Sequence, residues 1–282
     1  MSLAGLTIGR GRESLRVIGH VAVHVFKESV RDRVLYNLVV FAVLLIGASY
    51  VIGQLTAGQD VKIIKDLGLA ATSAFGLFIA VFLGIGLVSK EVDRRSIYSL
   101  LAKPLTRGEF ILGKYAGLVL TLAVNLAVMA VAQYAVLGYM AWTESPEFRA
   151  SWEAPATDPA LLKALFLIFV QLSLITAVAL FFSTFSSPLL SAALTVGLYV
   201  VGHFNADLRN FEAVVDSPIV GGLARSLYYV LPNLAPFDVK NAVVHAQPVP
   251  LGYLGLTTLY GATYVAVFVL ASIFVFSRRD FK

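Results

Sequence analysis

The chain contains long stretches without a single Asp, Glu, Lys or Arg, and these constrain its fold more than any other feature. Apolar residues make up 58% of its 282 residues and charged residues only 14%. Soluble globular domains carry about 25% charged residues, so this composition indicates a chain surrounded by lipid. A helix needs roughly 20 apolar residues to cross a hydrocarbon core about 30 Å thick, because it rises about 1.5 Å per residue. Each uncharged stretch therefore predicts a membrane-spanning helix.

The fold class predicted from these stretches is an all-α integral membrane domain of six spanning helices over residues 34–277. One uncharged stretch, 164–206, is about twice as long as a single crossing requires. Ser186-Ser187-Pro188 divides it, because proline lacks a backbone N–H and restrains the residue before it. The predicted spans are 34–53, 67–88, 114–140, 161–185, 188–204 and 252–277.

Basic residues are distributed unevenly between the two sides that six spans define. Fifteen of the 22 Lys and Arg residues fall in the N-terminal segment 1–33, the connection from Lys90 to Lys114, and the tail 278–282. Cytoplasmic loops carry an excess of Lys and Arg. The pattern therefore predicts a multi-pass protein of the bacterial inner membrane with that loop and both termini in the cytoplasm.

Two segments outside the spans have patterns of their own. In the N-terminal segment 1–33, apolar residues follow helical spacing from Leu15 to Phe26 among basic residues. This favours an amphipathic helix in the headgroup layer, or else an ordinary basic flank that orients the first span. In the external loop 205–250, a short apolar patch is interrupted by Arg225, Pro232 and Pro236. It predicts a re-entrant hairpin on the outer face before the last helix.

The cytoplasmic loop 89–110 carries the most information. Ile97, Leu100 and Leu101 have i, i+3, i+4 spacing, which predicts one apolar stripe on a short helix. Charged residues crowd its start and Lys103-Pro104 ends it. A loop with this many charges is not stabilised by lipid. It either contacts a soluble partner or only sets the orientation of the chain in the membrane.

The amino-acid sequence of this loop, with segments elsewhere in the chain, is similar to that of a known family. The segments that carry the similarity are Glu91-x-Asp-Arg-Arg-Ser96, Leu100-Leu-Ala-Lys-Pro-Leu-Thr-Arg107, Glu109-Phe-x-x-Gly-Lys-Tyr-x-Gly117, Leu231-Pro-Asn-Leu234 and Phe276-Ser-Arg-Arg-Asp-Phe281. They resemble ABC-2 type permeases, and look nearest to the subgroup that includes the copper-processing permease of nitrous oxide reductase maturation. The resemblance implies a type V exporter fold, in which the N-terminal helix and the loop rest on a separate nucleotide-binding subunit.

The same resemblance implies a role for the charged residues of the loop. The residues it assigns to coupling with the ATPase are Glu91, Asp93, Arg94, Arg95, Lys103 and Pro104. The alternative is that they only orient the membrane domain and form local ion pairs. Further partners expected on this interpretation are a second permease copy, membrane lipid and a periplasmic client, but no nucleic acid. A homodimer is expected in preference to a heterodimer.

No catalytic, cofactor or metal site is expected in the chain itself. Gly108 to Lys114 matches the G-x-x-x-x-G-K phosphate-binding pattern, but Tyr115 opens a membrane span where that motif needs Ser or Thr. ATP and Mg are therefore expected on the partner subunit. His20 and His24 have helical i, i+4 spacing, but no third metal ligand is evident. Cysteine is absent, which excludes thiol chemistry.

Within the spans, small and polar residues recur on single helix faces. Gly76, Ala80 and Gly84 follow one another every four residues, which predicts close helix packing. The polar candidates are Thr121, Asn125, Gln133, Gln171, Ser173 and Thr176. Because a polar group facing lipid is costly, these should face the bundle, either for interhelical hydrogen bonds or along a substrate pathway.

Three functions remain open from the sequence. The leading hypothesis is the permease of an ABC exporter. The first alternative is a mechanotransmission subunit that acts on a periplasmic client without moving cargo, which the extensive outer loops permit. The second is an ATPase-independent carrier, which the scarcity of acidic and basic residues in the spans disfavours.

Overall fold

The computed structural model describes residues 3–55, 60–93, 106–204 and 218–278, and all secondary structure within these residues is helical. The longer helices are α1 (Leu3–Val30), α2 (Arg33–Gln54), α3 (Asp60–Asp93), α5 (Arg107–Thr143), α7 (Ala160–Ser183), α8 (Pro188–His203), α10 (Pro218–Val230) and α12 (Leu251–Arg278). Shorter elements are α6 (Pro146–Ala150), the 3-10 helix η2 (Ala235–Phe237) and α11 (Lys240–Val244). The all-helical fold class is confirmed for the described residues.

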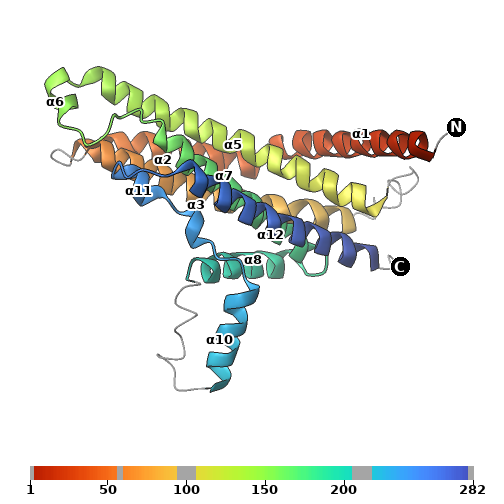
Figure 1. Ribbon diagram of the computed structural model, residues 1–282. Helices are drawn as coiled ribbons and strands as arrows, with labels where there is room; N and C mark the ends of the chain where they lie inside the picture. Colours follow the sequence, from red (N-terminus) through yellow and green to blue (C-terminus); the bar gives the residue numbers. More distant parts are fainter. Residues whose placement is uncertain (1–2, 56–59, 94–105, 205–217, 279–282) are drawn as a thin grey trace.

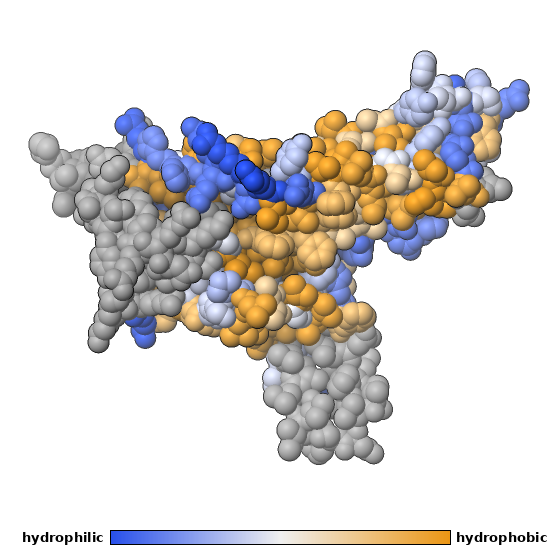
Figure 2. All heavy atoms as spheres, turned by 180° about the vertical axis from the view of Figure 1, so that it is seen from behind, coloured by the Kyte–Doolittle hydropathy of each residue, from blue (hydrophilic) through white to orange (hydrophobic). Residues whose placement is uncertain are grey.

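Among the described residues, five helices are long and apolar enough to cross a membrane: α2, α3, α5, α7 and α12. They lie side by side along one long axis (Figure 1), and the face seen in Figure 2 is apolar along much of its length. The sixth predicted span corresponds to α8, which has 16 residues. At about 1.5 Å per residue α8 is roughly 24 Å long, which is shorter than a typical hydrocarbon core.

The central helix is α7, which packs against α3, α5, α8 and α12. Its side chains are buried around most of its circumference, with Leu167, Ile175 and Val178 fully inaccessible. On α2, by contrast, Phe41 and Leu44 are each 61% exposed. A helix that is apolar all round belongs in the interior, whereas apolar side chains on a peripheral helix of a membrane protein face lipid.

The N-terminal helix α1 packs along the first part of α5, and both helices run in the same direction. Cβ atoms built on Gly113 and Gly117 would lie 2.6 Å from Val21 Cβ and from the Ala22 carbonyl oxygen, so only glycine permits this approach. Figure 1 shows α1 following the bundle axis and meeting α2 end to end. Its predicted place in the headgroup layer stays a prediction.

The segment that follows α10 packs against the bundle, and the outer hairpin predicted for this region stays a prediction. In Figure 1, α10 extends away from the bundle, whereas residues 231–250 return to it. Leu234, Phe237 and Val243 are fully buried in the core. Leu234 lies against Gly202 at the end of α8. The short α8 leaves space beside α7, and this segment fills it.

Candidate functional site

The start of α5, directly after the loop 89–105, holds a well-organised polar cluster. Thr106 caps the helix: its hydroxyl accepts a hydrogen bond from Glu109 N at 3.3 Å, and Thr106 N donates to Glu109 Oε2 at 2.9 Å. This reciprocal capping box satisfies two N–H groups that the first turn leaves without helical partners. The local sequence Thr-Arg-Gly-Glu therefore fixes where the helix begins.

Glu109 also connects α5 to α1. Its Oε1 accepts a hydrogen bond from the Ser14 hydroxyl, 95 residues away in sequence. One carboxylate thus holds the first turn of α5 and the N-terminal helix together. A hydrogen bond to a charged group is roughly twice as strong as a neutral one.

Arg107 connects α5 to the end of α12. Its Nη1 donates to the carbonyl oxygens of Phe276, at 3.4 Å, and Ser277. These carbonyls belong to the last turn of α12, where they have no helical N–H partner and the helix dipole is negative. The guanidinium therefore caps α12 both by hydrogen bonding and by charge.

Aromatic packing strengthens the same contact. The Phe110 and Phe276 rings stack with centroids 5.8 Å apart and planes 21° from parallel. Lys114 Nζ lies 4.6 Å from the centroid of the Phe110 ring, and this lysine is only 1% exposed. We call Ser14, Thr106, Arg107, Glu109, Phe110 and Phe276 the α5 junction.

The predicted ATPase-coupling residues precede this junction in the chain. Glu91 and Asp93 belong to the last turns of α3, but their side chains lie outside the described residues. Arg94, Arg95, Lys103 and Pro104 also lie outside them. The role predicted for these six residues stays a prediction, and the structure adds that the loop enters the α5 junction two residues after Pro104.

The six polar residues predicted to face the bundle divide into two groups. Thr121, Ser173 and Thr176 are buried, and each hydroxyl donates to the carbonyl four residues earlier in its own helix. Such bonds satisfy the hydroxyl locally and need no neighbouring helix. These side chains are therefore accounted for without a pathway.

The amides form the second group. Gln133 Nε2 donates to Lys65 O of α3 at 3.2 Å, and Gln171 Nε2 lies 3.0 Å from His203 Nε2 of α8. Both bonds join different helices. Asn125 Nδ2 and Gln133 Oε1 are buried without a hydrogen-bond partner among the described residues. A buried polar atom without a partner is costly, which marks the α5 face that carries them as a place where another polar group could bind.

The small-residue stripe of α3 lies against α7. A Cβ on Gly76 would lie 2.4 Å from Leu172 Cδ1, and one on Gly84 would lie 2.3 Å from Ala179 Cβ. Ala80, between them, is fully buried. At Gly84 the backbone of α7 also lies within 3.2 Å, so a methyl group does not fit there, whereas at Gly76 the end of the Leu172 side chain would have to move.

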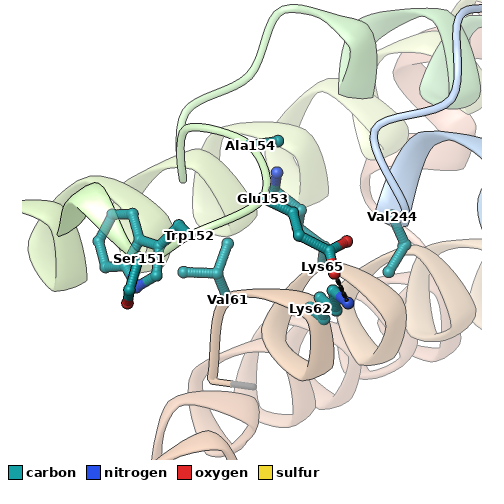
Figure 3. A pocket seen from close by; sticks show the side chains of 8 residues that line it. All are labelled: Val61, Lys62, Lys65, Ser151, Trp152, Glu153, Ala154 and Val244. Atoms are coloured by element: carbon teal, nitrogen blue, oxygen red, sulfur yellow. Dashed lines mark hydrogen bonds and ion pairs between the residues drawn. The ribbon is translucent and has the colours of Figure 1, made fainter. Parts of the chain in front are cut away.

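Sequence reasoning missed the lysines at the other end of the bundle. Lys62 Nζ forms an ion pair with Glu153 Oε1 at 2.6 Å, and the buried Lys65 Nζ donates to Pro155 O at 2.9 Å. Both bonds tie α3 to the loop after α6. With Trp152 and Val244 they line a pocket of about 150 Å³ (Figure 3). The signal was the i, i+3 spacing of the lysines, which places them on one helix face.

No group of three or more potential ligands capable of holding a metal ion occurs in the part of the chain that the structure describes. The side chains of His20 and His24 are exposed on α1.

The sequence pattern of one known family matches residues 20–215, which is more than half of the chain. That family is described as ABC-2 family transporter protein. No curated protein matches the chain. The match covers α2 to α8 and the charged loop between α3 and α5, and it gives no support to the copper-processing subgroup.

Proposed function

The chain belongs to the ABC-2 family of transporter proteins, whose permeases function with ABC ATPase subunits, and on this premise we propose that it is the membrane permease of an ABC exporter. ATP and Mg bind to the separate ATPase subunit. The cytoplasmic loop 89–110 receives the motion of that subunit when it closes on ATP. Two permease copies, identical in the simplest case, form the complete membrane unit in the bacterial inner membrane.

The observation that carries this proposal is the α5 junction. The loop is covalently continuous with Thr106, and the capping box makes the first turn of α5 a rigid acceptor of its displacement. From there, Glu109 bonds to α1 and Arg107 bonds to α12. A push on the loop therefore reaches two further helices through hydrogen bonds to charged groups rather than through apolar contact alone.

A second function is favoured by the outer end of the bundle. There, Lys62, Lys65 and the buried residues of segment 231–250 hold loops firmly to the helices. Such an ordered outer surface suits a mechanotransmission subunit that acts on a periplasmic client. The finer assignment to the copper-processing subgroup would be one case of this, and it stays a prediction.

Purification from native membranes tests the proposal at its first step. The chain is expected to retain a P-loop ATPase, and reversing the charges of Glu91 and Arg94 together is expected to release it. Glu147→Gln, an exposed carboxylate on α6 at the opposite end, is the matched control. A chain that purifies alone and remains active would contradict the proposal.

Distance measurement tests the second step. Because the chain has no cysteine, Ala150→Cys introduces a single labelling site beside α6. In a dimer the two spin labels are expected to change separation when ATP is added to the complex. The double variant Arg107→Ala, Glu109→Ala should keep the ATPase bound and ATP hydrolysis active while losing this change. An unchanged response in that variant would exclude the α5 junction as the connection.

A further inference from the structure

A second pocket lies between the joint of α1 with α2 and the facing part of α3. It measures about 250 Å³ and is lined by Glu28, Ser29, Asp32, Val34, Leu35, Phe82, Leu83 and Gly86. The charged residues around the joint give way here to the apolar sequence of α2. Such a transition marks the depth of the lipid headgroups. We call this the α1–α3 pocket.

Ser29 is the unusual residue of this pocket. It is 4% exposed, and its hydroxyl oxygen has no hydrogen-bond partner among the described residues. Other buried hydroxyls in the bundle, such as those of Thr72 and Thr121, donate to the carbonyl four residues earlier. An unsatisfied buried hydroxyl costs about 1–3 kcal/mol, which a polar ligand in the pocket would recover.

Among the described residues, the charged side chains that line the pocket are acidic. The Glu28 carboxylate stands next to Ser29, and Asp32 follows one turn later, where its Oδ1 also caps α2 by accepting from Val34 N at 2.9 Å. The basic residues Arg31 and Arg33 are exposed beside the pocket without lining it. This arrangement complements a zwitterion with a cationic tip and an anionic group next to it.

The remaining lining, from α2 and α3, is apolar and partly open. Phe82 is 53% exposed and Val34 is 47% exposed, whereas Leu83 closes the bottom at 3%. A Cβ built on Gly86 would meet nothing within 4 Å, so space remains beside that glycine. An acyl chain along Phe82 and Val34 would continue from a headgroup bound at Glu28 and Ser29.

We propose that the α1–α3 pocket binds the headgroup of an amine-bearing phospholipid such as phosphatidylethanolamine. The lipid ammonium donates to the Glu28 carboxylate and the Ser29 hydroxyl. Its phosphate lies toward Arg31 and Arg33, and its acyl chains follow the apolar wall. The site depends on the membrane setting of the chain and not on its coupling to an ATPase.

Native mass spectrometry of the purified chain, equilibrated with equal amounts of phosphatidylethanolamine and phosphatidylglycerol, tests this proposal. The wild-type chain is expected to retain the amine lipid about fivefold over the glycerol lipid, as one added ion pair permits. Gly86→Leu fills the pocket without changing charge, and Glu28→Gln removes the carboxylate. Both should abolish the preference. The matched controls Gly138→Leu, at another open helix glycine, and Glu147→Gln should preserve it.

Ser29→Ala provides a readout of opposite sign. It should raise the melting temperature of the delipidated chain, because it removes an unsatisfied hydroxyl, and lower retention of the amine lipid. Equal retention of the two lipids by the wild type, or an unchanged preference in Gly86→Leu, would overturn the proposal. It would also be overturned if soluble phosphoethanolamine competed as well as the lipid, or if Gly86→Leu dissociated a dimer, because a small solute or a second chain would then occupy the pocket.

Discussion

Arg107, at the start of α5, donates a hydrogen bond to the carbonyl oxygen of Ser277, in the last turn of α12, across 170 positions of sequence. The bond joins α5, the helix that follows the charged loop, to α12, the last helix among the described residues. It places a permanent positive charge at the negative end of the α12 dipole. A displacement of either helix end therefore acts on the other.

Replacing Arg107 by alanine is expected to uncouple these two helices. The loss of a charged donor to two carbonyls should cost about 1–2 kcal/mol of stability and lower the melting temperature in detergent by a few degrees. Arg149→Ala, on the exposed helix α6, serves as the control and should change it little. If the two variants had the same melting temperature, the hydrogen bonds between Arg107 and α12 would not contribute to stability.

Removing the N-cap of α5 should make the first turn of this helix, where the loop joins it, open more often. Thr106→Ala breaks one half of the capping box and should cost about 1 kcal/mol. Hydrogen exchange of the first turn, at residues 107–110, is expected to accelerate by roughly fivefold. Ser145→Ala removes a similar cap from the five-residue helix α6 and should leave that exchange unchanged. Equal acceleration in both variants would point to a global effect instead.

Gly84 of α3 is expected to tolerate no side chain. Gly84→Ala places a methyl group where Ala179 Cβ would lie 2.3 Å away, so the helices must separate at a cost of about 1–3 kcal/mol. Gly197→Ala on α8 meets nothing within 4 Å and should stabilise the helix by up to about 1 kcal/mol. Melting temperatures of the two variants should therefore shift in opposite directions. A Gly84→Ala variant as stable as the wild type would contradict the close contact of α3 with α7.

The ion pair between Lys62 and Glu153 should break when the pH is lowered. The hydrogen bond from Lys62 holds the pKa of Glu153 below its ordinary value of 4.5, so folding favours the deprotonated carboxylate. This contribution is fully present above pH 4.5 and is lost as the pH falls through the lower pKa of the folded state. In a Trp142→Phe background, Trp152 fluorescence should report the release of the loop below pH 4.5. Glu153→Gln should remove this transition; a transition that persisted would have another origin.

The apolar stretches predicted most of the helices, because in lipid the backbone can satisfy its hydrogen bonds only by forming helices or closed barrels. Helix ends were less predictable. The second span was expected from residue 67, but α3 begins at Asp60. The first turns of α3 carry Lys62 and Lys65, which bond to Glu153 and to the Pro155 carbonyl oxygen. Those partners are about 90 residues away in the sequence, so the sequence pattern did not reveal them.

The candidate site was only partly accessible to sequence reasoning. The sequence places Thr121 and Gln133 on the bundle-facing side of one helix, but it does not show which hydrogen bonds they form. Thr121 donates within its own helix, whereas Gln133 donates to α3. Likewise, the prolines around Leu234 predicted a turn but did not indicate that Leu234 would be buried against α8. Both outcomes depend on which helices become neighbours.

The parallel course of α1 and α5 has a mechanical consequence. Val21 and Val25 are seated on Gly113 and Gly117, so the two helices cannot slip past one another without unseating both contacts. From Ser14 to the start of α2 at Arg33 the chain rises roughly 28 Å at about 1.5 Å per residue. If the proposed coupling operates, α1, which is held at Glu109 and along α5, would transmit a displacement of the loop to the start of α2.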